Sequence, residues 1–109
     1  MVTADLHIHT NYCDGKSGIE EIILSAINKG LSAVGISSHG FTDFDTSYCI
    51  KAEKIPEYIK EIEDLKDKYK DKIKVLTGVE HDLYSSKLNG KYDYVIGSMH
   101  YIKVGDKYY

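Results

Sequence analysis

The sequence of 109 residues contains no arginine; its fourteen basic residues are all lysines, and its formal net charge is −3. Proteins that read nucleic acids usually present a basic, arginine-bearing surface, so this balance counts against a nucleic-acid partner. Arginine is also the usual bidentate ligand of phosphate. A phosphate bound by this protein would therefore need metal ions, lysines, or an arginine from further chain.

Cysteine and long apolar runs are also scarce. Cys13 and Cys49 are too few for a disulfide framework, and two thiols in a reducing cytoplasm are the expected state. No apolar stretch approaches the roughly 18 residues of a membrane-spanning helix. The first residues lack the basic and apolar regions of a secretory signal. With 42% apolar and 28% charged residues, the sequence predicts one small soluble domain in the cytoplasm.

Hydrophobic periodicity predicts four strands and two helices. The strands are expected at residues 2–8, 33–38, 73–79 and 93–99. The first helix is expected to begin with a capping box of Ser17 and Glu20 and to stop at Gly30. The second is expected to carry Pro56 in its first turn and to reach about residue 70.

Strands that alternate with helices at this spacing predict βα units and a parallel sheet. Active sites of such folds gather at the carboxyl ends of the strands. A complete (β/α) barrel needs about 200 residues or more. The sequence therefore predicts either a small open sheet or, as we favour, the front half of a larger α/β domain.

Six metal-type side chains follow or end the predicted strands. His7 and His9 lie two residues apart on an extended segment, so both imidazoles face the same side, about 6.6 Å apart along the strand. Asp14 comes in the loop that follows, and His39 closes the second strand. Each of these residues has a structural explanation when taken singly. Their common edge favours a shared metal site.

The third and fourth strands complete the pattern. Glu80 follows an apolar strand, where an uncompensated carboxylate would be costly, and it best fits a carboxylate that bridges two metal ions. His100 again ends an apolar strand, whereas His81 faces away from Glu80 and is expected to be structural or to support a ligand from behind. Two bridged metals activate water and neutralise phosphoryl oxygens. Because Cys13 has no base beside it, the pattern indicates a metal-dependent hydrolase without a covalent nucleophile.

These residues resemble the PHP family (polymerase and histidinol phosphatase), whose barrel opens with an Asp-x-His-x-His-Thr motif, here residues 5–10. The segments 44–49, 78–82 and 93–102 are most similar to the histidinol-phosphatase branch. The resemblance implies the N-terminal part of a distorted (β/α)7 TIM-like barrel with about four parallel strands present. Residues 1–109 would then be a truncated PHP domain, its N-terminal half, and inactive alone.

The resemblance also implies a centre of two or three divalent metal ions, with zinc, manganese and iron all suitable. The ligands that it implies are His7, His9 and Glu80 for one metal, Glu80 and His100 for a second, and Asp14 with His39 for a third. Glu80 and His100 would be catalytic through a metal-bound water. The implied reaction is hydrolysis of L-histidinol phosphate to L-histidinol and phosphate in histidine biosynthesis.

Two departures from the family accompany this resemblance. Ser38 stands where the family often has an acidic residue, which would loosen the third metal. The family's remaining ligands and its phosphate-binding arginine belong to the second half of the barrel.

Two other functions are alternatives to that of a histidinol phosphatase. One is a PHP phosphoesterase or exonuclease acting on nucleotides or DNA, and the other is a non-catalytic metal-binding domain.

Overall fold

The computed structural model describes residues 4–41, 49–82, 90–98 and 103–108. Their main feature is a four-stranded parallel sheet in the order β1-β2-β3-β4. The strands are β1 (Ala4–Asp5), β2 (Ala33–Ile36), β3 (Lys74–Asp82) and β4 (Tyr94–Ser98). The helices are α1 (Ile19–Asn28) and α2 (Ile55–Lys68), the latter preceded by the 3-10 turn η1 (Ala52–Lys54).

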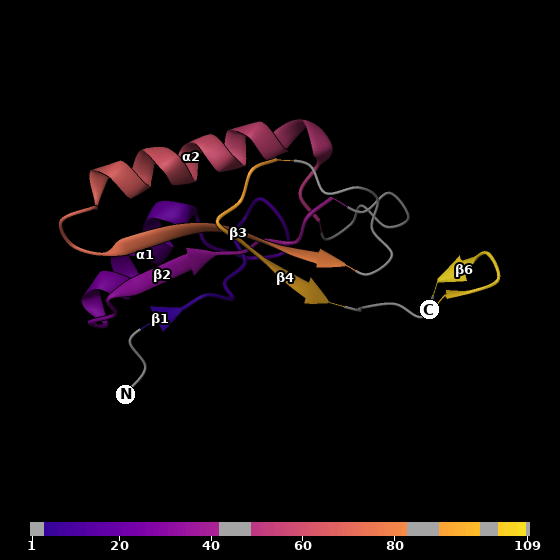
Figure 1. Cartoon of the computed structure of the whole chain (residues 1–109), viewed down its shortest axis with the longest axis horizontal. Coiled ribbons are helices and arrows are strands. Elements are labelled where there is room, and N and C mark those ends of the chain that lie inside the picture. The colour runs from indigo at the N-terminus through magenta and orange to yellow at the C-terminus, as the bar shows by residue number, and fades with distance from the viewer. Residues whose placement is uncertain (1–3, 42–48, 83–89, 99–102, 109) are drawn as a thin grey trace.

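The helices cover one face of a curled sheet (Figure 1). α1 packs against β2, α2 packs against β3, and the two helices contact each other. This arrangement is a half-barrel of βα units, which confirms the fold class expected from the sequence. None of the described helices combines the length and the apolar character needed to cross a membrane.

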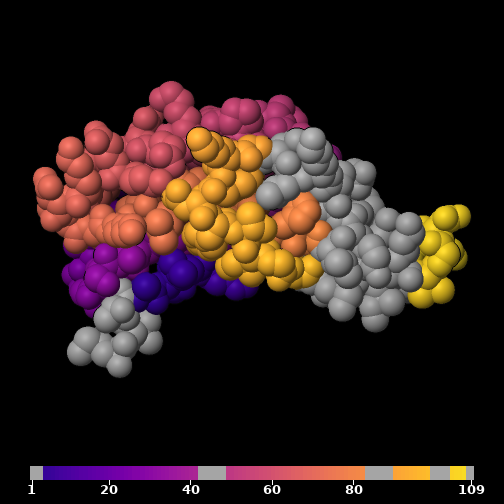
Figure 2. Space-filling view, viewed as in Figure 1, coloured from indigo at the N-terminus to yellow at the C-terminus, as the bar shows by residue number. Residues whose placement is uncertain are grey.

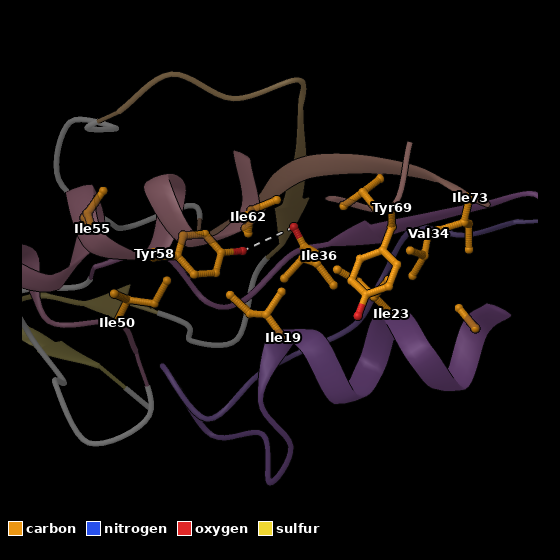
Figure 3. Close-up of a cluster of buried hydrophobic side chains, with 12 residues drawn as sticks. Ile19, Ile23, Val34, Ile36, Ile50, Ile55, Tyr58, Ile62, Tyr69 and Ile73 are labelled. Atoms are coloured by element: carbon orange, nitrogen blue, oxygen red, sulfur yellow. Dashed lines mark hydrogen bonds between the residues drawn. The ribbon is translucent and has the colours of Figure 1, made fainter. Parts of the chain in front are cut away.

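The hydrophobic core lies between the two helices and the strands β2 and β3 (Figure 3). Fully buried side chains from α1, α2 and β2 meet there: Ile19, Ile23, Tyr58, Ile62, Val34 and Ile36. Full burial of one such aliphatic side chain stabilises the fold by roughly 1.5–3 kcal/mol relative to exposure. The core therefore fixes the helices against the amino-terminal part of the sheet.

The two ends of α1 differ from each other in how well the sequence predicts them. The expected capping box is wrong: Gly18 is the N-cap residue, and no side chain caps the helix. Glu20 instead accepts hydrogen bonds from Lys68 and Tyr69. The expected stop at Gly30 is confirmed, since this residue has a φ of +78° and the backbone bonds of a Schellman motif.

The strands β1 and β2 are shorter than the sequence predicts, and β3 is longer. Regular pairing of β1 with β2 ends at Asp5 and Val34. Beyond this point the Ser37 amide still donates to the Ile8 carbonyl, while the hydroxyls of Ser37 and Ser38 accept bonds from the amides of Ile8 and Thr10. β3 continues to Asp82 because it pairs with β4 up to Ser98. The end of the expected fourth strand, at residue 99, lies outside the described residues.

A short antiparallel hairpin follows the sheet and was not expected from the sequence. It consists of β5 (Lys103–Val104) and β6 (Lys107–Tyr108), with Gly105 at a φ of +61° in the turn. The hairpin lies at one end of the long axis of the molecule (Figures 1 and 2). β4 and the segment before it run across the near face of Figure 2.

A tyrosine from β4 lies across the face of the sheet that the helices leave open. An added Cβ atom would come within 2.2 Å of Tyr94 at Gly35 and within 2.3 Å of its ring at Gly78. The Tyr94 hydroxyl donates a hydrogen bond of 2.5 Å to the carbonyl of Leu6. The two glycines therefore create the space through which β4 reaches the segment after β1.

Candidate metal centre

Five of the six residues expected as ligands come from the carboxyl ends of three neighbouring strands. His7 and His9 follow β1, Asp14 lies in the next loop, His39 comes three residues after β2, and Glu80 lies within β3. His39 and Glu80 are themselves joined by an isolated parallel bridge. The parallel sheet therefore brings together side chains that are up to 73 residues apart in the chain.

The first group of ligand atoms consists of His7, His9 and Glu80, within 4.8 Å of one another. The Nε2 atom of His7 contacts Oε1 of Glu80, and the Nε2 atom of His9 lies 3.3 Å from the same oxygen. The imidazole of His7 is half exposed, whereas the Glu80 carboxylate is buried. One buried oxygen therefore faces two imidazole nitrogens at the edge of solvent.

The second group consists of His9, Asp14 and His39, and it shares His9 with the first. The Nδ1 atom of His9 lies 3.0 Å from Oδ1 of Asp14, and the Nε2 atom of His39 lies 3.3 Å from Oδ2 of Asp14. His39 also reaches the first group, because its Nδ1 atom lies 3.0 Å from Oε2 of Glu80. The two groups are thus adjacent, linked through His9 and through the carboxylate of Glu80.

The proton count of these contacts fits a cation site. His9 and His39 each direct both ring nitrogens at carboxylate oxygens, and His7 directs one. A neutral imidazole carries only one N–H group. Three neutral imidazoles can therefore supply protons to at most three of these five nitrogen–oxygen contacts. Protonated imidazoles or metal ions would satisfy the remaining pairs, and imidazole with carboxylate is a common donor set for divalent transition metals.

The electrostatics of the two carboxylates point in the same direction. Burial raises the pKa of Glu80, but the nearby charge of His39 and the hydrogen bonds from His9 and His7 outweigh it, so the pKa lies below the usual range. Burial also raises the pKa of Asp14, but the nearby charge of His39 and the hydrogen bond from the Cys13 thiol outweigh it. The pKa of Asp14 therefore also lies below its usual value. Both groups are anions at neutral pH, as metal ligands must be.

Serine hydroxyls hold the histidine-bearing segment in place. The Ser37 hydroxyl accepts a bond from the Ile8 amide and donates one to the Leu6 carbonyl, each 3.0 Å long. The Ser38 hydroxyl accepts a 2.9 Å bond from the Thr10 amide. These bonds clamp the backbone on both sides of His7 and His9. Sequence reasoning missed this role, because it treated the serines only as small strand residues.

Cys13 lies directly behind the second group. Its Sγ atom accepts a hydrogen bond from the His39 amide and donates one to Oδ1 of Asp14, both at 3.4 Å. The thiol therefore contacts two of the predicted ligands, which gives it a structural role at this place. In the sequence, only its position next to Asp14 indicates that Cys13 lies near the predicted ligands.

Other expected residues are placed less centrally. Asp5, the first residue of the Asp-x-His-x-His-Thr motif, accepts a bond from the backbone amide of His7. His81 is half-buried and follows Glu80 in β3, on the other side of the strand. Ser38, which replaces the acidic residue of the family pattern, is fully buried. His100 lies outside the described residues, so its role as a ligand stays a prediction.

The chain is similar to known proteins over most of its length. The model of the PHP domain family matches residues 5–109. A "Probable histidinol-phosphatase" of Deinococcus radiodurans is 32% identical over 109 aligned residues, which cover 90% of this chain and 42% of that protein. The DNA polymerase/3'-5' exonuclease PolX of Bacillus subtilis is 28% identical over 107 residues, covering 92% of this chain and 18% of that protein.

A solved structure shares the fold. It is that of histidinol phosphate phosphatase from Lactococcus lactis subsp. lactis, complexed with zinc, L-histidinol and phosphate. The TM-score is 0.72 at 25% identity, and the match covers 95% of this chain and 41% of that one. The chain therefore spans less than half the length of each of these proteins.

Proposed function

The chain belongs to the PHP domain family, and from this we propose that it carries part of the active site of a metal-dependent phosphomonoesterase. The substrate that we propose is L-histidinol phosphate, which would be hydrolysed to L-histidinol and phosphate in histidine biosynthesis. The Deinococcus relative bears the name of this activity, and the Lactococcus structure holds L-histidinol, phosphate and zinc. These names concern proteins more than twice as long as this chain.

The observation that carries the proposal is the environment of Glu80. The Glu80 side chain is 2% exposed, and its two carboxylate oxygens face the imidazoles of His7, His9 and His39. A buried carboxylate shared by several imidazoles at the carboxyl edge of a parallel sheet suits a ligand that bridges two cations. We propose zinc first, with manganese or iron as alternatives.

The predicted ligands form groups, each of which would hold one metal. Glu80 with His7 and His9 would hold one metal, and Asp14 with His39 would hold another beside it. His100 is proposed as a further ligand that shares a metal with Glu80. When bound, such metals supply an activated water and positive charge for the phosphoryl oxygens. The half-exposed imidazole of His7 marks the side of the centre that substrate can reach.

Phosphate recognition would rest on the metals, because the chain has no arginine. Lysines or residues of a longer protein can add to it. That residues 1–109 alone turn over little substrate stays a prediction. We propose the cytoplasm as the location, since Cys13 and Cys49 form no disulfide.

The proposal is tested with the Glu80→Gln variant, which keeps the shape of the side chain and removes its charge. The measurement is made in a longer PHP protein that contains this chain, because residues 1–109 alone are predicted to turn over little substrate. There we expect the loss of zinc binding and of at least about 100-fold in kcat for L-histidinol phosphate, because Glu80 joins both groups of predicted ligands. Treatment of the unaltered protein with a chelator should have the same effect, and added zinc should restore the activity. Glu21→Gln, at an exposed site on α1, is the matched control and should keep the full rate.

If the longer protein is active and its E80Q variant hydrolyses L-histidinol phosphate at the unaltered rate, the proposal is overturned. The PolX relative makes release of nucleotides from a DNA 3′ end the rival activity, although the negative net charge disfavours it. Nucleotide release without cleavage of L-histidinol phosphate would establish that rival. Tight zinc binding with no hydrolysis of any phosphoester would instead indicate a non-catalytic metal-binding domain.

A further inference from the structure

The ladder between β2 and β3 is interrupted close to the candidate metal centre. Ile36 pairs with Thr77, and beyond the end of β2 His39 pairs with Glu80 in the same register. On the far side of the interruption, the Glu80 amide donates a 3.0 Å bond to the carbonyl of Ser38. Because the register is unchanged, the interruption is neither a bulge nor a slip of one strand along the other.

The interruption is filled by a side chain from α2. In this register the Ser38 amide would donate directly to the Gly78 carbonyl. Instead, the hydroxyl of Tyr58 accepts a 3.1 Å bond from the Ser38 amide and donates one of 2.9 Å to the Gly78 carbonyl. The same hydroxyl lies 3.2 Å from the carbonyl of Ile36, the contact drawn in Figure 3. One rung of the ladder thus passes through Tyr58.

Tyr58 is held firmly enough to define this rung. The side chain is 0% exposed, and the ring of Tyr12 packs edge-on against it at 5.4 Å between ring centroids. Burial raises the pKa of Tyr58 above its usual range, so the hydroxyl keeps its proton and remains both donor and acceptor. A hydroxyl has one proton to donate, and the nearer carbonyl, that of Gly78, is its main acceptor.

The inserted hydroxyl sets the spacing of the two strands where the ligands emerge. Two bonds of 3.1 and 2.9 Å in series replace one backbone bond of about 2.9 Å, which holds Ser38 and Gly78 apart at this rung. His39 is the next residue after Ser38, and Glu80 is the second after Gly78. The side chains of these two ligands lie 3.0 Å apart, Nδ1 to Oε2.

We propose that Tyr58 is a positioning residue of the metal centre, whose hydroxyl, inserted into the β2–β3 ladder, sets the separation of His39 and Glu80. The inference rests on the metal-binding part of the proposed function. Tyr58, a buried helix residue that packs as a core side chain, would thus have a specific effect on the metal ligands. The effect passes through two backbone groups rather than through a contact with the metal or the substrate.

The test uses Tyr58→Phe, which removes one oxygen atom and keeps the ring. We expect a loss of about 10- to 100-fold in zinc affinity, the range for residues that orient metal ligands. With cobalt(II) in place of zinc, the visible absorption bands should shift, because these bands report the ligand geometry. Tyr69→Phe removes a hydroxyl bonded to the remote Glu20, and it should leave affinity and bands unchanged. Ile62→Val, one turn further along α2, controls for a general loss of stability.

The outcomes separate this inference from the proposed function. If the unaltered protein binds neither zinc nor cobalt(II), the metal centre itself is refuted. If it binds both, and Y58F is folded with the same affinity and the same bands, the positioning role alone is refuted. A matching loss in I62V would also refute it, since loss of stability would then explain the effect.

A measurement on the unaltered protein covers the case in which Y58F does not fold. Zinc should slow hydrogen exchange of the Ser38 amide at least tenfold, because a bound metal would restrain His39 and Glu80 around the Tyr58 rung. The amide of Leu31, which caps the far end of α1, should exchange at an unchanged rate. An unchanged Ser38 rate in zinc-bound protein would contradict the proposal.

Discussion

The two ends of the sheet are built by different kinds of contact. At the amino end, β2 and β3 pair directly from Ala33 and Lys74 to Ile36 and Thr77, and aliphatic side chains from both helices cover them. At the carboxyl end, hydroxyl groups bond to backbone groups between the remaining direct pairs, and the side chains are imidazoles and carboxylates. Burial of apolar side chains at the amino end stabilises the fold. This stability offsets the cost of holding buried polar groups at the carboxyl end.

The largest effect in this comparison is expected from the core at the amino end. Ile62→Ala removes buried methyl groups from α2, and we expect it to lower the free energy of unfolding by about 2–5 kcal/mol. Because Ile62 belongs to the hydrophobic core cluster and not to the groups of predicted ligands, zinc affinity measured on the folded fraction should stay within about threefold. Denaturant unfolding and zinc titration of the same samples check both parts. A large loss of affinity in fully folded protein would show that the two ends are not separable.

A smaller effect is expected from the open face of the sheet, where Tyr94 crosses the glycines. An added Cβ atom at Gly78 would come within 2.3 Å of the Tyr94 ring, so Gly78→Ala should lower the free energy of unfolding by about 1–3 kcal/mol. The control is Gly97→Ala in β4, where an added Cβ atom meets nothing within 4 Å. Thermal unfolding of the two variants should differ clearly. Equal melting temperatures would mean that Tyr94 does not occupy this space.

The smallest effect is expected from charges on the outer surface, away from the centre. Lys66 donates to both Glu63 and Asp93, and these bonds, with others from Thr77, lower the pKa values of the two carboxyls. A carboxyl whose pKa is lower in the folded state stabilises the fold above its unfolded pKa. This stability is lost as the pH falls through the folded value.

Unfolding measured between pH 7 and pH 3 should therefore show stability falling below about pH 4.5, near the unfolded pKa values. The double variant Glu63→Gln/Asp93→Asn should lose part of this pH dependence. Glu53→Gln, an exposed change in η1, should keep the full dependence. The result would be contradicted if both variants followed the same curve as the unaltered protein.

The sequence predicts the amino end of the sheet better than the carboxyl end. Periodicity places both helices and all four strands, because a buried apolar face leaves a regular trace in the sequence. The Asp-x-His-x-His-Thr motif and the strand-end positions also identify His7, His9, His39 and Glu80, which the structure brings together. Their role as metal ligands stays a prediction, as does that of His100.

The hydroxyl bridges could not be predicted, for a physical reason. Ser37, Ser38 and Tyr58 take part in bonds to residues that are 20 to 31 positions away in the chain, and no local pattern records such partners. Tyr58 also falls on the apolar stripe of α2, where a tyrosine is expected to pack by its ring. The capping box failed for a related reason, because Glu20 bonds to Lys68 and Tyr69 instead of the helix end.

The bond from Tyr94 to the Leu6 carbonyl has a consequence for the order of folding. It joins residues 88 positions apart, and the contact of His7 with Glu80 spans 73 positions. The hydrogen bonds within a helix, in contrast, join residues only four positions apart. Closing long loops is entropically costly and slows the steps that depend on it. We therefore expect the two helices and their core to form early and the ligand cluster to form last. A metal ion would then bind a nearly finished sheet rather than nucleate it.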